Sequence, residues 1–225
     1  MNTTENGLTV AVLASALDRW ADRMEAAADE LNALDGRLGD GDLGATLAKC
    51  AQNIRAIRPG LDDGGTGDGG VGDGDLGQAF KACAMACSKA SGSSFGTLLA
   101  VAFLTAAKAT AGRTSLPCSE LPQLLGDILS ALSARGGAAL GDKTVLDPLD
   151  AVREALASLD AGERSDTAAQ HGAATRATDR TIEIFRNKPN RIGRARMFAE
   201  RSVGLDDPGM IAFRHMVESL RPIRP

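Results

Sequence analysis

Three aspartates close together are the strongest chemical signal in this sequence. Asp35, Asp40 and Asp42 lie within the segment LDGRLGDGDLG, which spans residues 34–44. Carboxylates this close repel one another unless a cation lies among them. Oxygen ligands without histidine or cysteine suit Mg²⁺ or Ca²⁺, and the glycines let the backbone turn sharply enough to gather the side chains. The spacing alone leaves two interpretations open: a metal site, or an acidic loop that caps a helix and faces water.

Three further segments combine turns with polar or cationic residues and a helix start. ASGSSFGT (residues 90–97) opens a helix whose first N–H groups form a natural phosphate cradle, although plain serine capping explains the same residues. GDKTVLD (residues 141–147) carries one cation. GRARMFAERSVGLDDPG (residues 193–209) gathers Arg194, Arg196 and Arg201. Solvated surface charge is the alternative for the last two. Together, a metal loop, a phosphate-type turn and clustered cations are the parts that phosphoryl transfer needs.

The elements that must position these residues are helices. Apolar residues recur at spacings of three and four, and no segment alternates as a strand would. The chain is therefore predicted to be all-α. Short connections between most of the helices favour antiparallel neighbours in a bundle. We expect eight helices, over about residues 8–34, 43–57, 76–90, 95–111, 121–133, 149–159, 167–185 and 209–220.

Several residues predict where these helices begin and end. Pro59 is expected to stop the second helix, and Asp147 and Asp207, each followed by proline, are expected to be N-caps. Residues 60–74 are nearly all Gly and Asp and are predicted to form a flexible loop. The hexapeptide GDGDLG occurs twice, and its second copy is interpreted as a helix start with Asp75 as the N-cap.

Length and composition limit the class of protein. The 225 residues, with 44% hydrophobic and 24% charged residues, fit one globular domain of generous size or two small ones at most, and we expect a single domain over residues 1–225. A pI near 5.3 argues against nucleic-acid binding. The longest apolar run is too short to span a bilayer, and the N-terminus lacks the basic region of a secretion signal, so we expect a cytoplasmic protein. The four cysteines are too few for a disulfide framework and are expected to be core thiols.

The four motifs, in this order, resemble the L subunit of dihydroxyacetone kinase (DhaL), a family of DAK2-type nucleotide-binding domains. The matching patterns are GDGDxG, ASGxxFGT, GDKTxxD and GRAxxxxERSxGxxDPG, and the likeness extends from about Leu31 to the C-terminus. The resemblance implies an eight-helix antiparallel barrel with a nucleotide and Mg²⁺ site at one end.

The resemblance also implies roles for individual residues. Asp35, Asp40 and Asp42 would hold one or two Mg²⁺ ions and, with Arg194, would form the catalytic set for phosphoryl transfer. ADP or ATP would be bound by a larger set: Leu43, Gly44, Ala45, Thr46, Ala90, Ser91, Gly136, Val145, Arg194, Asp207, Pro208 and Gly209.

Two positions depart from the family pattern. The family loop usually carries a His and an Asn where this chain has Leu43 and Thr46. The loss of one hydrogen-bond donor to a phosphate typically costs about 1–3 kcal/mol. Two functions are therefore considered: a working kinase L subunit, and a catalytically weakened regulatory or scaffold relative.

The resemblance implies partners as well. The substrate would be dihydroxyacetone or a related small ketose, held covalently through a histidine by a separate DhaK-like subunit. The phosphoryl donor would be ATP itself, or a DhaM-like protein of the phosphotransferase system would rephosphorylate bound ADP. We expect no nucleic-acid or membrane partner, and the oligomeric state stays open, with a homodimer among the options.

Overall fold

The computed structural model describes residues 7–62, 74–90, 94–193, 196–197 and 199–222. The described residues form ten α-helices and two short antiparallel strands, in which Leu8 pairs with Leu116. The helices are α1 (Val10–Ala26), α2 (Ala28–Asp35), α3 (Leu43–Asp62), α4 (Leu76–Ser88), α5 (Ser94–Ala109), α6 (Leu121–Gly136), α7 (Leu146–Ala157), α8 (Ala161–Ser165), α9 (Thr167–Arg186) and α10 (Pro208–Ser219). The strands are β1 (Gly7–Thr9) and β2 (Ser115–Pro117).

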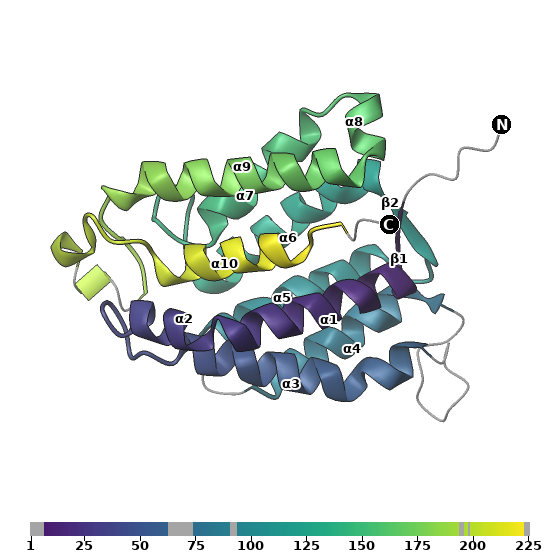
Figure 1. The fold of residues 1–225 in the computed structure, drawn as a ribbon, viewed down its shortest axis with the longest axis horizontal. Helices are drawn as coiled ribbons and strands as arrows, with labels where there is room; N and C mark the ends of the chain where they lie inside the picture. The colour runs from purple at the N-terminus through teal and green to yellow at the C-terminus, as the bar shows by residue number, and fades with distance from the viewer. Residues whose placement is uncertain (1–6, 63–73, 91–93, 194–195, 198, 223–225) are drawn as a thin grey trace.

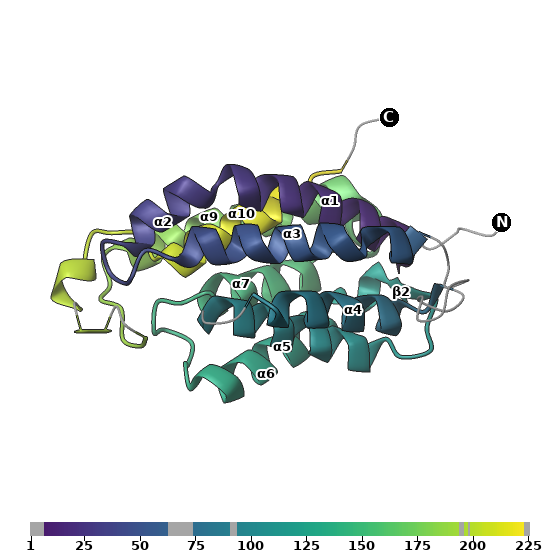
Figure 2. The same cartoon turned by 90° about the horizontal axis from the view of Figure 1, so that it is seen from below.

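Eight of these helices form a closed ring, so the predicted eight-helix barrel is confirmed. The order of contact is α1, α3, α4, α5, α6, α7, α9 and α10, and α10 packs back against α1. Neighbours in the ring run in opposite directions, and the start of α1 and the end of α10 lie at the end of the barrel away from α2 (Figures 1 and 2). No helix of the described residues is long and apolar enough to cross a membrane.

The two additional helices and the strand pair are where the sequence-based prediction was incomplete. The predicted first helix breaks at Ala27 into α1 and α2, and the five-residue α8 precedes α9. Three-residue strands are too short to show the alternation by which strands are recognised in a sequence, and so β1 and β2 were not predicted.

Two predicted helix ends were wrong. The second helix does not stop at Pro59 but runs on to Asp62, because Leu61 is buried in the core and its packing holds the last turn. Asp147 is not an N-cap: α7 begins at Leu146, and the Asp147 carboxylate instead accepts the N–H groups of Gly141 and Thr144 in the preceding loop.

Other predicted ends are confirmed or lie outside the described residues. Asp75 accepts the N–H groups of Gly77 and Gln78, and Asp207 accepts that of Met210, as N-caps should. Of the flexible loop predicted over residues 60–74, residues 60–62 belong to α3, Gly74 directly precedes the N-cap of α4, and residues 63–73 are outside the described part of the chain.

Glycines let parts of the chain approach one another closely, both within the ring and between the ring and α2. A Cβ atom added to Gly77 of α4 would lie 2.7 Å from the Cα atom of Ala111, and one added to Gly44 of α3 would lie 1.9 Å from the carbonyl oxygen of Ala28. All four cysteines are free thiols, and the expected burial in the core is confirmed for Cys50, Cys83 and Cys87 but not for Cys118, which is only half-buried. The helices are therefore packed backbone against backbone at several points.

The contact at Gly44 makes a testable prediction about stability. Gly44→Ala should lower the free energy of unfolding by about 3 kcal/mol or more, because only a shift of α2 away from α3 makes room for the methyl group. Gly60→Ala, on the same helix, is the matched control. An added Cβ there meets no heavy atom of the described residues within 4 Å, and alanine should stabilise the helix by about 0.5–1 kcal/mol. Urea unfolding of both variants measures the difference, and equal stabilities would contradict the packing.

Candidate functional site

A cleft of about 230 Å³ opens at the end of the barrel next to α2. The first residues of three helices line it, namely Leu43 of α3, Ser94 of α5 and Pro208 of α10, and Val145 joins them just before α7 begins. Antiparallel neighbours explain this convergence, because every second helix of the ring starts at the same end. A helix N-terminus carries a partial positive charge and unpaired N–H groups. The cleft is therefore suited to a negatively charged ligand.

The three aspartates predicted to hold a metal meet on one wall of this cleft. Asp35 ends α2, while Asp40 and Asp42 lie in the turn before α3, and one carboxylate oxygen from each lies within 4.8 Å of the others. Asp35 is half-buried and the other two are exposed. Gly41 gives the turn its shape with a φ of +77°, and a side chain on Gly39 would collide with the Asp35 carboxylate. The three carboxylates match the oxygen donor set of a Mg²⁺ site.

Helix α2 caps the start of α3. The Asp35 Oδ2 atom accepts the N–H of Asp42 at 3.0 Å and that of Leu43 at 3.4 Å, and the Asn32 Oδ1 atom accepts the N–H of Ala45 at 3.0 Å. The capping interpretation is therefore correct for Asp35. The carboxylate of Asp42 takes none of these hydrogen bonds and stays available for a cation.

The structure places only part of the predicted nucleotide set in the cleft. Five residues line it: Leu43, Val145, Asp207, Pro208 and Gly209. Gly44 packs against α2, and the N–H groups of Ala45 and Thr46 already bond to Asn32 and to the Asp42 carbonyl. Ala90 is buried just beyond α4. Gly136 is exposed at the end of α6, where it lies next to the lining residue Leu98 but does not itself line the cleft. Ser91 and Arg194 lie outside the described residues.

Leu43 stands where the family pattern has a histidine, and it differs from histidine in its location as well as its polarity. Its side chain is 6% exposed and belongs to the main apolar core, although it also borders the cleft. It offers the cleft no hydrogen-bond donor. The wall beside the aspartates is therefore apolar at the position where the family pattern has a histidine.

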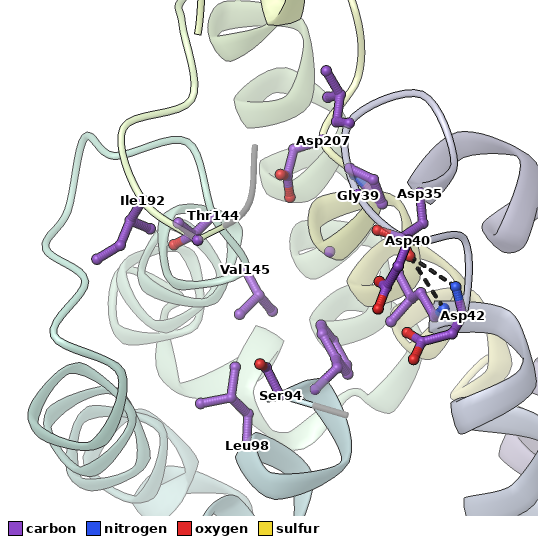
Figure 3. Close-up of a pocket in the computed structure, with 16 residues that line it drawn as sticks. Asp35, Gly39, Asp40, Asp42, Ser94, Leu98, Thr144, Val145, Ile192 and Asp207 are labelled. Atoms are coloured by element: carbon purple, nitrogen blue, oxygen red, sulfur yellow. Dashed lines mark hydrogen bonds between the residues drawn. The ribbon is translucent and has the colours of Figure 1, made fainter. Parts of the chain in front are cut away.

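An apolar wall faces the aspartates across the cleft, and sequence reasoning did not find most of it. Figure 3 shows Thr144, Val145 and Ile192 opposite the three carboxylates, with Ser94 and Leu98 below Val145 in this view. Ser94 and Thr144 belong to motifs that were noticed in the sequence. Leu98 and Ile192 carry no signal, because their approach to the site depends on packing. An acidic wall facing an apolar one suits a ligand with a charged end and a flat apolar part.

Asp207 lines the cleft and also forms a hydrogen bond to the buried residue Asn190. Its Oδ1 atom accepts the N–H of Met210 at 2.9 Å, and its Oδ2 atom accepts the side-chain N–H of Asn190 at 2.7 Å. Burial raises the pKa of the Asp207 carboxyl to about 6, although these hydrogen bonds and the charge of Lys143 lower it in part. Lys143 is itself completely buried, so solvated surface charge is the wrong interpretation for this residue.

Comparison with known proteins identifies the family. The sequence model described as DAK2 domain matches residues 37–221. The chain is 36% identical to the D-erythrulose kinase of Mycolicibacterium smegmatis over 199 residues, covering 88% of this chain and 33% of that protein. It is 30% identical to the PEP-dependent dihydroxyacetone kinase, ADP-binding subunit DhaL, of Escherichia coli over 207 residues, covering 91% of this chain and 92% of that subunit. The resemblance predicted from the four motifs is confirmed.

A solved structure shows the same fold. The dihydroxyacetone kinase of C. freundii, in complex with AMP-PNP and Mg²⁺, matches 98% of this chain with a TM-score of 0.68 at 22% sequence identity. The match covers 35% of that kinase chain. The present chain thus spans about a third of the C. freundii kinase and of the D-erythrulose kinase, and nearly all of the E. coli subunit.

The capping arrangement predicts that two aspartates of the cluster differ in their effect on stability. In metal-free buffer, Asp35→Ala should lower the free energy of unfolding by about 1 kcal/mol, because the start of α3 loses its acceptor. Asp42→Asn should leave stability unchanged or slightly higher, since it removes one of three repelling charges. Urea unfolding with a chelator present compares the two, and equal losses would contradict the separate roles.

The raised pKa of Asp207 predicts a pH dependence of stability. The carboxyl ionises near its usual pKa of 3.8 in the unfolded chain and near 6 in the folded protein, so its contribution to folding is largest below about pH 4. That contribution falls as the pH rises to about 6, by on the order of 3 kcal/mol relative to Asp207→Asn, and is constant above this range. Urea unfolding of both proteins at a series of pH values measures it. A difference that is flat from pH 4 to pH 7 would show that the pKa is not raised.

Proposed function

The chain belongs to the DAK2 domain family, and from this premise we propose that it is the nucleotide-binding subunit of a kinase for dihydroxyacetone or a related small ketose. The single observation that carries the proposal is the meeting of three carboxylates and the starts of four helices at one cleft. Carboxylates supply a cation site, and helix starts supply a phosphate site. A metal–nucleotide complex needs both.

The aspartate cluster fits Mg²⁺, and Asp35, Asp40 and Asp42 would hold one or two such ions. A Mg²⁺ ion held there would supply neutralisation of the phosphate charge, which is the contribution of a metal to phosphoryl transfer. Asp35 also orients the turn through its bonds to the N–H groups of Asp42 and Leu43. The same side chain therefore fixes the backbone that carries the other two carboxylates.

The remaining walls of the cleft orient the nucleotide. The starts of α5 and α10, with Ser94 and Gly209 in the lining, face the side on which phosphates next to the metal would lie. Leu98, Val145 and Ile192 offer an apolar surface for a flat base. In this chain the described residues of the cleft bind and orient, and the acceptor hydroxyl is expected to be presented by another protein.

The acceptor and the partner follow from the relatives by analogy. The names of the relatives include a dihydroxyacetone kinase and a D-erythrulose kinase, which act on small ketoses. We infer a separate DhaK-like subunit that holds the ketose. Free ATP is one phosphoryl donor in this scheme, and a DhaM-like protein that rephosphorylates bound ADP is the other.

A regulatory or scaffold relative is the second candidate function, and Leu43 is the observation that favours it. The side chain is packed in the core and donates nothing to the cleft. Thr46 does not line the cleft either. Weak nucleotide binding with intact folding would support this second function.

Loss of a single carboxylate tests the proposed function. Wild-type protein should bind ADP and ATP in the presence of Mg²⁺, with little binding in its absence, and Asp40→Asn should weaken this binding by about a hundredfold because the cation loses a charged ligand. Asp179→Asn, an exposed change of the same kind on α9, should bind as wild type does. Titration calorimetry of the full chain measures all three.

Each outcome of this titration has a distinct meaning. Tight Mg²⁺-dependent binding by Asp40→Asn would overturn the metal assignment. Absence of binding by the folded wild-type chain would overturn the kinase proposal and favour the regulatory function.

A further inference from the structure

Lys143 is an unusual cation, because it is completely buried and its ammonium is bound by backbone alone. Its Nζ atom donates to the carbonyl oxygens of Lys188, Ser202 and Leu205, each at 2.8 Å, and to that of Arg186 at 3.1 Å. An ammonium has three N–H groups, so the four carbonyls share them. Burial of a charge is costly unless such partners compensate it.

The backbone at Lys143 is also strained. Its φ is +62°, and it is the only residue other than glycine with a positive φ in the described part of the chain. Such a conformation persists only where the surroundings impose it. Two bonds to the Asp147 carboxylate, from the N–H groups of Gly141 and Thr144, fix the loop on either side. The loop is thus built to direct this side chain inward.

The four carbonyls come from the two ends of one stretch of chain. Arg186 and Lys188 lie at the end of α9, whereas Ser202 and Leu205 lie just before α10. Asn190 makes further links between these parts. Its side-chain N–H groups donate to the Lys143 carbonyl at 2.9 Å and to Asp207 at 2.7 Å, and its backbone N–H donates to the Ser202 hydroxyl.

This arrangement joins the two chain segments that form one side of the cleft. Thr144 and Val145 follow Lys143 directly and line the cleft. Ile192 and Gly193 line it from the stretch that the ammonium ties together, and Asp207 lines it just after that stretch, at the start of α10. The aspartate cluster stands on the opposite wall (Figure 3), and none of its three residues supplies a carbonyl to the Lys143 ammonium.

We propose that Lys143 is a positioning residue, whose buried ammonium clamps the ends of the 186–205 stretch to the loop before α7 and so preforms the nucleotide wall of the cleft. The part of this inference that concerns nucleotide rests on the proposed function. Methionine has a similar length but no charge, so it fills the space and leaves four carbonyls unpaired. Alanine leaves a cage of carbonyl oxygens open to a small added ammonium ion.

The experiment compares Lys143→Ala, Lys143→Met and the control Lys81→Met in the full chain. Lys81 is exposed on α4 and belongs neither to the clamp nor to the lining of the cleft. Both Lys143 variants should lose Mg²⁺–ADP affinity by about tenfold to a hundredfold, the usual effect of removing a supporting residue behind a site. Affinity for Mn²⁺ alone, a probe of the aspartate wall, should be unchanged, and Lys81→Met should bind both as wild type does.

Chemical rescue distinguishes positioning by the ammonium from general loss of packing. Propylammonium should restore most of the ADP affinity of Lys143→Ala, because it can supply the missing N–H donors to the four carbonyls. Tetramethylammonium, which has no N–H, should not. Lys143→Met should not respond to either ion, because its side chain occupies the cage. Unchanged ADP affinity in Lys143→Ala, or a loss that propylammonium does not reverse in the folded variant, would overturn the proposal.

Hydrogen exchange of the wild-type protein keeps the inference testable if the variants do not fold. The N–H of Arg191 donates to the Asp142 carbonyl, and that of Gly204 donates to the Arg186 carbonyl. Both should be protected without any ligand, since the clamp forms in the free protein. Rapid exchange of both would overturn the clamp even if nucleotide binds. If instead nucleotide fails to bind while both are protected, the proposed function fails and the clamp stands.

Discussion

The alternation of helix direction around a closed ring is the constraint on which the site depends. Because neighbours are antiparallel, α3, α5, α7 and α10 all start at the same end, and their partial positive charges add there. At two of these helix starts a carboxylate of the protein partly compensates the positive charge. Asp35 does so at the start of α3, and Asp207 at the start of α10. The remaining field stabilises the acidic cluster against its own repulsion and still favours an anionic ligand. A single feature of topology thus prepares the cleft for both a cation and phosphate.

The break between α1 and α2 is what gives the carboxylates separate roles. It lets α2 turn so that Asn32 and Asp35 reach the first N–H groups of α3. These hydrogen bonds require α2 and α3 to approach closely, which the absence of a side chain at Gly44 permits. Because α2 supplies the caps, Asp42 does not have to use its carboxylate on its own helix. The local geometry of a helix start therefore decides which aspartates remain for a metal.

The two walls of the cleft are stabilised by different kinds of interaction. The aspartate wall depends on hydrogen bonds between α2 and the start of α3, which follow one another in the chain, and under the proposed function a cation would stabilise it further. The facing wall depends on the buried Lys143 ammonium and on Asn190, which join parts of the chain that are distant in sequence. The desolvation of this charge is compensated by four carbonyls with fixed positions. Under both proposals, the aspartate wall would therefore change in stability when a cation binds, whereas the wall held by Lys143 would keep its structure without ligand.

Local spacing determined much of this protein. Apolar periodicity located every helix of the ring, the caps at Asp75 and Asp207 followed from residue type and neighbours, and the three aspartates were grouped by proximity along the chain alone. Tertiary structure decided what local spacing could not. The burial of Leu61 extends α3 beyond Pro59. The Asp147 carboxylate accepts an N–H from the loop before α7 and does not cap the helix. Leu98 and Ile192 line the cleft because of how the helices pack. The inward orientation of Lys143 is the clearest case, because its partners lie 43 to 62 residues later in the chain and only folding brings their carbonyls to one point.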